Sequence, residues 1–289
     1  TRASVMTGRH PNRLGVFKWG YPMRPQEITL AEALKTAGYK TAHFGKWHLG
    51  SVRRDSPASP GACGFDHWIS APNFYDNDPI LSHQGKAVKH EGESSIIAVN
   101  SALQWMEKNA TDDAPLFIVV WFGSPHRPHR ALEEDRRHYA GQPNNVQHFL
   151  GEVTGMDRAF GRLRRGLDDL GIRENTILWY TSDNGALPVG STGGRRGNKG
   201  SIYEGGLAVP GILQWPSRIR QPRTTNVRCN TSDIYPTLLE VTGVSMKGQP
   251  PLDGISLVPL IAGEMRARPR PMGFWDYPAG GISTPSAEW

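Results

Sequence analysis

The sequence predicts an α/β protein with a doubly wound, mostly parallel sheet that has helices on both faces. Two apolar runs, at 115–122 and 176–181, have the composition of strands buried on both faces. Amphipathic segments at 94–108 and 152–170 precede them, and strands that alternate with helices pair in parallel. Because neither end of the chain completes a strand–helix unit, the sheet is expected to be incomplete at both ends.

The other elements follow from spacing and from helix-ending residues. Residues 28–37 have apolar side chains at helical spacing, with Thr29 as the N-cap and Gly38 as the stop. Residues 51–93 are rich in Gly, Pro, Ser, Asp and His and lack periodicity, which predicts a long loop or insertion. The remaining expected elements are a strand at 41–44, a strand at 207–215 and a helix at 232–242.

Composition limits the class of protein. Hydrophobic residues make up 37% and charged residues 21% of the 289 residues, which is typical of a globular enzyme. No apolar run reaches the roughly 18 residues of a membrane span. A formal charge of +6 favours anionic partners, but no nucleic-acid motif accompanies the dispersed arginines, so no nucleic-acid partner is expected. The two cysteines exclude a disulfide scaffold, and they form no C-x-x-C pair for zinc.

Two loops place cations and imidazoles directly after predicted strands, where α/β folds gather functional residues. The loop after 41–44 presents Lys46 and His48 between glycines. A fixed cation beside a titratable imidazole suits the binding of a tetrahedral oxyanion and proton transfer next to it. The loop after 115–122 carries His126 and His129, stiffened by two prolines. Taken alone, this second loop also fits a surface loop with solvated charges.

Two further segments have the chemistry of ion-binding sites. Asp183 and Asn184 follow the run at 176–181, and such paired oxygens suit Ca²⁺ or Mg²⁺ better than zinc, although Asp-Asn-Gly is also a common turn. The glycine-rich segment 193–206 carries Lys199 and has backbone N–H groups to cradle an anion. Its spacing is not that of a P-loop, and the same composition fits a flexible basic loop.

Five segments in order resemble the formylglycine-dependent sulfatases, an arylsulfatase-like family of the alkaline phosphatase superfamily. Residues 1–8 follow the end of C-x-[PS]-[ST]-R-x-x-x-x-T-G, and residues 38–48 follow G-Y-x-T-x-x-x-G-K-x-H. The other three segments resemble A-P-H-x-P at 125–128, S-D-N-G at 182–185 and G-K-G-[ST]-x-Y-E-G-G at 198–206, with Asn198 before the lysine. The resemblance runs from residue 1 to about 260, nearly the whole chain.

The resemblance implies hydrolysis of sulfate esters, either aryl sulfates or sulfated glycans, by a catalytic α/β domain over 1–262, with 263–289 beginning a C-terminal subdomain. It implies catalytic roles for five residues, namely Arg2, Lys46, His48, His126 and Lys199. The two lysines would bind the sulfate. His48 would act as a base on the formylglycine hydroxyl, and His126 would protonate the leaving oxygen. Arg2 would hold the formylglycine and help to neutralise the metal site.

The resemblance also implies a second histidine candidate and a metal. His129 is the second choice for the histidine that contacts the substrate, because some relatives carry an H-x-P-H arrangement. Asp183 and Asn184 would supply two ligands of a bound Ca²⁺, with Mg²⁺ as the less favoured ion.

The nucleophile expected from the resemblance is not in the sequence. The modified cysteine would lie three residues before Thr1, with further acidic metal ligands upstream of it. The chain by itself is therefore expected to lack the first strand of the sheet, to be inactive and to be poorly stable. The resemblance further implies a formylglycine-generating enzyme as a partner of the full-length protein, and export to a periplasm, a lysosome or the exterior.

Three other classes of protein remain as alternatives. An inert relative would bind sulfated glycans without cleaving them. A phosphatase or phosphodiesterase of the same fold would need several Asp and His residues for two zinc ions. An N-terminal hydrolase would use Thr1 as its nucleophile, in a different layered fold. The presence of both lysines and both histidines favours the sulfatase, and Asp183 with Asn184 favours a single hard cation.

Overall fold

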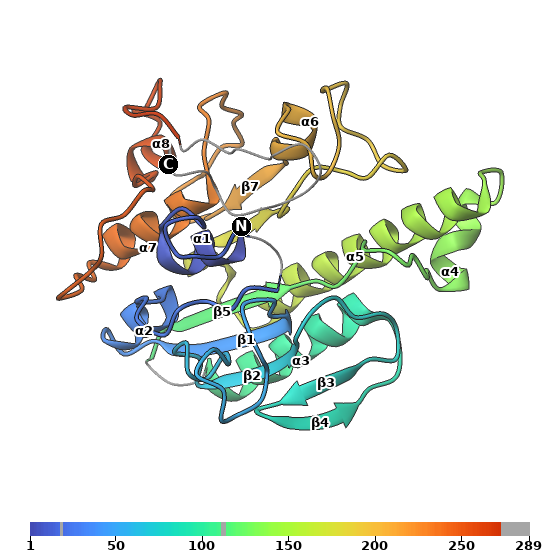
Figure 1. The fold of residues 1–289 in the computed structure, drawn as a ribbon, viewed down its shortest axis with the longest axis horizontal. Helices are drawn as coiled ribbons and strands as arrows, with labels where there is room; N and C mark the ends of the chain where they lie inside the picture. The colour runs from blue at the N-terminus through green and yellow to red at the C-terminus, as the bar shows by residue number, and fades with distance from the viewer. Residues whose placement is uncertain (18–19, 111–113, 273–289) are drawn as a thin grey trace. The chain divides into compact units, whose positions relative to one another are not determined.

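The computed structural model describes residues 1–17, 20–110 and 114–272, and it contains two compact units (Figure 1). One unit is Gly38–Ile172, and the other combines Thr1–Ala37 with Arg173–Trp289. The segment 273–289, which makes up most of the expected C-terminal subdomain, lies outside the described residues. The domain boundary expected at 262 stays a prediction.

A five-stranded sheet with the order β4-β3-β2-β1-β5 forms the centre of the Gly38–Ile172 unit. β1 pairs in parallel with both β2 and β5, whereas β3 and β4 extend the sheet beyond β2 as an antiparallel hairpin. β1 is buried along nearly its whole length because it has a neighbour on each side. The strands are β1 (Lys40–Lys46), β2 (His67–Ala71), β3 (Ile80–His83), β4 (Lys86–Lys89) and β5 (Leu116–Trp121).

Two sequence expectations about these strands are wrong in part. The stretch 51–93 is not one long loop, because β2, β3 and β4 lie within it. Each of these strands has only four or five residues, too few for an alternating pattern to stand out. β5 was expected to be buried on both faces, but only Val119 in it is fully buried, since β5 lies at the edge of the described sheet.

Two long helices support the strands of this unit (Figure 1). α3 (Ser94–Asn109) packs on β1 and β5, and α5 (Asn144–Asp169) packs on α3. The Glu93 carboxylate caps α3 by accepting the first free N–H groups of the helix. α5 begins at Asn144, before the expected residue 152, and its first turns carry Val146, Phe149 and Leu150 at helical spacing. The short helix α4 (Glu133–Arg136) and a 3₁₀ turn (Arg137–Tyr139) precede it.

The second unit contains short helices and a two-stranded antiparallel sheet of β6 (Leu178–Thr181) and β7 (Gly211–Gln214). The predicted N-cap Thr29 is confirmed, since its side chain and that of Glu32 form a reciprocal capping box. The strand expected at 207–215 is confirmed as the shorter β7, while Leu207 is the last residue of the helical turn before it. The helices are α1 (Arg2–Thr7), α2 (Leu30–Lys35), α6 (Glu204–Leu207), α7 (Ile234–Thr242) and α8 (Val258–Ala262), with 3₁₀ turns at Arg173–Asn175 and Thr231–Asp233.

The expected helix at 232–242 is confirmed as α7 and the turn before it. Within the described ranges, no helix is long and apolar enough to cross a membrane.

Candidate active site

Lys46 is the last residue of β1, and the structure buries it almost completely, with 5% of its surface exposed. Gly45 makes this strand end possible: its φ is 94°, and a Cβ there would lie 2.0 Å from the Trp121 carbonyl oxygen. The loop that follows is anchored by Trp47, whose buried indole N–H donates to the Ala58 carbonyl at 2.8 Å. The ammonium group therefore sits on a rigid strand end in a poorly solvated environment, where a positive charge acts strongly on an anion.

His48 follows this anchor in a left-handed backbone conformation, with a φ of 55°. Its N–H donates to the Pro72 carbonyl at 3.2 Å, which fixes the imidazole-bearing residue to the segment after β2. Non-glycine residues in this conformation are uncommon and cluster at functional positions. The backbone at the end of β1 therefore holds Lys46 and His48 in constrained positions, as expected from the sequence for this lysine and histidine.

The loop 123–130, here called the histidine loop, begins at the end of β5. The parallel register aligns Gly45 of β1 with Trp121 of β5, so Lys46 and the histidine loop lie at the same edge of the sheet. The His126 ring uses Nδ1 to donate to the Arg127 carbonyl at 2.8 Å, since a carbonyl oxygen can only accept. This contact fixes the tautomer of the neutral ring and makes Nε2 the nitrogen that gains and loses the second proton.

His129 lies in a different environment from His126. Its ring packs against Phe149 of α5, with ring centroids 5.3 Å apart. Burial lowers the pKa of His129, and the nearby Arg127, His126 and His148 lower it further. The lowered pKa favours the neutral form of His129 at pH 7. A neutral imidazole binds an anion more weakly than an imidazolium cation does.

Glu152 of α5 holds the far end of the histidine loop. The side chain is 7% exposed, and its Oε1 accepts the Arg130 N–H at 2.5 Å. Burial raises the pKa of Glu152 to about 8, the Arg130 N–H opposes the rise, and the charges of Asp76 and Glu93 add to it. Sequence reasoning missed this residue, because nothing in the pattern of α5 marks a polar position that faces a distant loop.

We expect the protonation of Glu152 to make the free energy of unfolding depend on pH. The carboxyl titrates near 4.5 when unfolded and near 8 when folded, so its contribution is fully present below about 4.5 and is lost as pH rises towards 8. Glu152→Gln keeps the acceptor for Arg130 but cannot ionise. Urea unfolding between pH 5 and 8 should therefore show the unsubstituted chain losing stability relative to Glu152→Gln.

The exposed Glu134 provides the control for this comparison. Its hydrogen bond with Arg158 lowers its pKa, so Glu134→Gln should track the unsubstituted chain between pH 5 and 8. The prediction would be contradicted if the free energies of unfolding of Glu152→Gln and of the unsubstituted chain changed equally with pH over this range.

In the second unit, Asp183 and Asn184 follow the end of β6, as expected. The Asp183 carboxylate accepts from Arg2 at 2.9 Å through Oδ2 and from the Asn184 amide at 2.7 Å through Oδ1. The Asp183 carbonyl accepts from the Thr1 hydroxyl at 2.7 Å. The start of α1 is thereby joined to the strand end.

The glycine-rich segment returns to this strand end by close backbone packing. The Lys199 N–H donates to the Ala186 carbonyl at 2.9 Å, and the Gly185 N–H donates to the Gly206 carbonyl at 2.9 Å. A Cβ at Gly205 would lie 1.9 Å from the Gly197 carbonyl oxygen, so only glycine fits there. The exposed Lys199 side chain is therefore carried by a fixed loop beside Asp183 and Asn184, not by the flexible loop that composition alone allows.

The side-chain oxygens of Asp183 and Asn184 are of the chemical type that binds a hard cation. Carboxylate and amide oxygens are the ligands that Ca²⁺ and Mg²⁺ prefer, and Ca²⁺ takes six to eight of them. Across the described part of the chain, however, no group of three or more His, Cys, Asp or Glu side chains is arranged so that it could hold a metal ion. By themselves, these two residues would complete only part of a coordination sphere, and their role as metal ligands stays a prediction.

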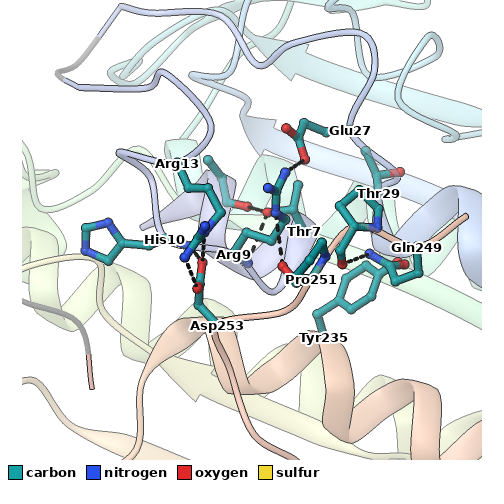
Figure 2. Close-up of polar contacts among 12 residues, drawn as sticks. Thr7, Arg9, His10, Arg13, Glu27, Thr29, Tyr235, Gln249, Pro251 and Asp253 are labelled. Atoms are coloured by element: carbon teal, nitrogen blue, oxygen red, sulfur yellow. Dashed lines mark hydrogen bonds and ion pairs between the residues drawn. The ribbon is translucent and has the colours of Figure 1, made fainter. Parts of the chain in front are cut away.

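Polar contacts that no motif indicated hold the segment after α1 in place (Figure 2). Arg9 donates to the buried Glu27 at 2.5 Å, and Arg13 makes two hydrogen bonds to Asp253, at 3.0 and 2.9 Å. These partners are far apart in sequence, so only the fold reveals them. They fix the C-terminal end of the helix whose first residue is Arg2.

The structure thus brings the predicted residues together in two groups, one in each unit. Lys46, His48, His126 and His129 share the sheet edge of the Gly38–Ile172 unit. The group in the other unit consists of Arg2, Asp183, Asn184 and Lys199. Their roles in binding and catalysis stay predictions.

Comparison with known proteins places the chain in one family. A family model described as Sulfatase matches residues 1–244. An ulvan-active sulfatase of Formosa agariphila is 32% identical over 267 residues, which cover 85% of this chain and 52% of that protein. The N-acetylgalactosamine-6-sulfatase of Canis lupus familiaris is 29% identical over 318 residues, which cover 93% of this chain and 58% of that protein. The chain therefore spans little more than half the length of these curated relatives.

A solved structure has the same fold. The crystal structure of Ps i-CgsB in complex with k-i-k-neocarrahexaose superposes with a TM-score of 0.85 at 23% identity, covering 91% of this chain and 65% of that one. The predicted α/β fold class, of the alkaline phosphatase type, is confirmed.

Proposed function

The chain belongs to the sulfatase family, and on this premise we propose that it takes part in hydrolysing a saccharide sulfate ester. The reaction is R–O–SO₃⁻ + H₂O → R–OH + HSO₄⁻, in which the bond from sulfur to the alcohol oxygen breaks. The observation that carries the proposal is the common strand edge at which Lys46, a buried cation, ends β1 and the histidine loop follows β5. A cation and an acid–base group at one sheet edge suit the transfer of an anionic group.

The two lysines are proposed to bind the sulfate oxygens. Lys46 is fixed at a buried strand end, where its charge is poorly screened by water. Lys199 stands on a loop that close glycine packing holds in one conformation. Fixed cations stabilise charge that develops on the transferring group without reorganising, which is the largest single term in many such reactions.

The histidines are proposed to move protons. With Nδ1 donating to the Arg127 carbonyl, the His126 imidazolium carries its transferable proton on Nε2, and the leaving oxygen would take that proton as the ester bond breaks. His48 would accept a proton as the base. His129 is proposed to contact the substrate from the same loop.

The proposed reaction also requires a nucleophile and a metal. Formylglycine supplies the attacking oxygen when the protein carries it, and a hard divalent cation, proposed to be Ca²⁺, supplies positive charge. Asp183 and Asn184 would be two of the metal ligands, and Arg2 would keep the Asp183 carboxylate oriented through its ion pair. A formylglycine-generating enzyme is the proposed partner that would modify the full-length protein. The protein is proposed to be exported to a periplasm, a lysosome or the exterior.

The saccharide is proposed as the substrate class because of the relatives. One is named for its activity on ulvan and another for N-acetylgalactosamine 6-sulfate. These names describe those proteins, and they support a sugar sulfate over an aryl sulfate for this one.

Release of inorganic sulfate tests the proposal. The full-length protein, incubated with sulfated polysaccharides and with 6-sulfated N-acetylgalactosamine, should release sulfate that ion chromatography detects. Lys46→Ala should release far less, because it removes a cation that contacts the sulfate. Tight binding of these saccharides with no release of sulfate would instead identify an inert relative.

A further inference from the structure

Phe74 lies face to face with the ring of His126. The ring centroids are 4.7 Å apart and the planes differ by 19°. Phe74 comes from the segment between β2 and β3, whereas His126 follows β5, so only the fold brings the two rings together. We infer that Phe74 is a positioning residue for the His126 imidazole, an inference that rests on the proposed role of His126 as proton donor.

The backbone beneath this pair of rings is tightly fixed. Tyr75, the next residue along from Phe74, is 7% exposed and packs in a core cluster with Ala71, Leu81 and Ile97. A Cβ at Gly123 would lie 2.5 Å from the Tyr75 carbonyl oxygen. The segment that carries Phe74 and the start of the histidine loop therefore meet backbone to backbone, and neither shifts without the other.

The segment that carries Phe74 also contacts the far end of the histidine loop, at Arg130. The Asn77 amide donates to the Arg130 carbonyl at 2.7 Å, and the Asp76 carboxylate lies 3.4 Å from the Arg130 guanidinium. Contacts at Gly123 and at Arg130 thus bracket the loop, with the two rings between them. Phe74 is the first residue of the segment 74–77, which makes both contacts.

The hydrogen bond to Arg127 and the stacking on Phe74 restrain different motions of the His126 ring. The hydrogen bond from Nδ1 to the Arg127 carbonyl selects the ring orientation and the tautomer. Stacking on Phe74 restrains rotation about the bond between Cβ and the ring, because turning the imidazole out of plane would lose the face-to-face contact. An aromatic face also attracts the imidazolium cation. Together they direct the Nε2 proton along one line.

A simpler account is that Phe74 only fills space. The histidine loop contains its own comparison, since His129 touches Phe149 with a tilt of 56° rather than a parallel stack. Both phenylalanines contact a histidine of the same loop, but only Phe74 can restrain a ring plane by stacking. Phe149→Leu is therefore a matched control for Phe74→Leu.

The kinetic test compares Phe74→Leu, Phe74→Tyr and Phe149→Leu in the full-length protein. Phe74→Leu should lower kcat for an alkyl or sugar sulfate by roughly tenfold, because misplaced groups lose rate even when binding is kept. KM should change little, and a nitrophenyl sulfate, whose leaving group needs little protonation, should lose less. Phe74→Tyr keeps the stacking face and should restore the rate. Phe149→Leu should not change the dependence on the leaving group.

Nitrogen NMR of the His126 ring gives a readout that needs no turnover. In the unsubstituted protein the neutral ring should be a single Nδ1–H tautomer, and Phe74→Leu should yield a mixture of tautomers, while Phe74→Tyr and Phe149→Leu should not. Phe74→Met serves if the leucine variant does not fold.

An unchanged tautomer in folded Phe74→Leu or Phe74→Met would overturn the inference whether or not the protein proves to be a sulfatase. Absence of sulfate release from every variant, with the tautomer change present, would instead contradict only the proposed function.

Discussion

Asp183→Ala is expected to abolish sulfate release by the full-length protein and to remove its thermal stabilisation by Ca²⁺. The substitution takes away the one charged ligand of the Asp183–Asn184 pair, together with the ion pair to Arg2. A ligand at about 100 times its Kd stabilises a protein by about 2.7 kcal/mol, a shift that a melting experiment resolves. Melting temperatures with and without Ca²⁺, alongside activity, test the prediction.

Asp253→Ala is the matched control for this experiment. It removes another carboxylate of the same unit, one that accepts two hydrogen bonds from Arg13, without touching the proposed metal ligands. Asp253→Ala should melt at a lower temperature but keep its response to Ca²⁺. If Asp183→Ala keeps the same response, Asp183 and Asn184 form a turn and not a metal site.

His126→Ala is expected to slow hydrolysis most for esters whose alcohol is a poor leaving group. Proton transfer by a positioned side chain is worth about 10² to 10⁴ in rate, and a nitrophenolate leaves without much of that help. The loss in kcat/KM should therefore be larger for an alkyl or sugar sulfate than for nitrophenyl sulfate. A series of leaving groups assayed with the full-length protein measures the dependence.

His129→Ala separates the two histidines of the loop. Burial and nearby cations favour the neutral form of His129, so its loss should be smaller and should not depend on the leaving group. A steeper dependence in His129→Ala than in His126→Ala would reverse the two roles and favour the H-x-P-H register.

The strand-end residues could be predicted from the sequence because local signals locate them. An apolar run marks β5, and the residues after such a run lie at the carboxyl edge of a parallel sheet. The register of β1 and β5 then places Lys46 and the histidine loop at one edge, as the alternation of strands and helices implies. The helix cap at Thr29 was predictable for the same reason, since its signal lies within four residues.

The residues that hold the site could not be predicted in this way. Phe74 meets His126, and Glu152 meets Arg130, through contacts between segments with no shared periodicity. Glu152 has no local signal, because the sequence does not distinguish a buried glutamate on a helix from a solvent-exposed one. The strands within 51–93 were missed because a strand of four residues carries too little pattern. The close backbone packing around Gly205 likewise cannot be read from the sequence and is seen only in the fold.

The account depends most on the claim that this chain is part of a protein that hydrolyses sulfate esters. The most direct measurement is the ratio of kcat/KM for 4-nitrophenyl sulfate to kcat/KM for 4-nitrophenyl phosphate, taken with the full-length protein and with Lys46→Ala. The account predicts that the sulfate ester is strongly preferred and that Lys46→Ala loses most of that activity. A preference for the phosphate ester, or no release of sulfate from 4-nitrophenyl sulfate or from sulfated saccharides that the protein still binds, would contradict it.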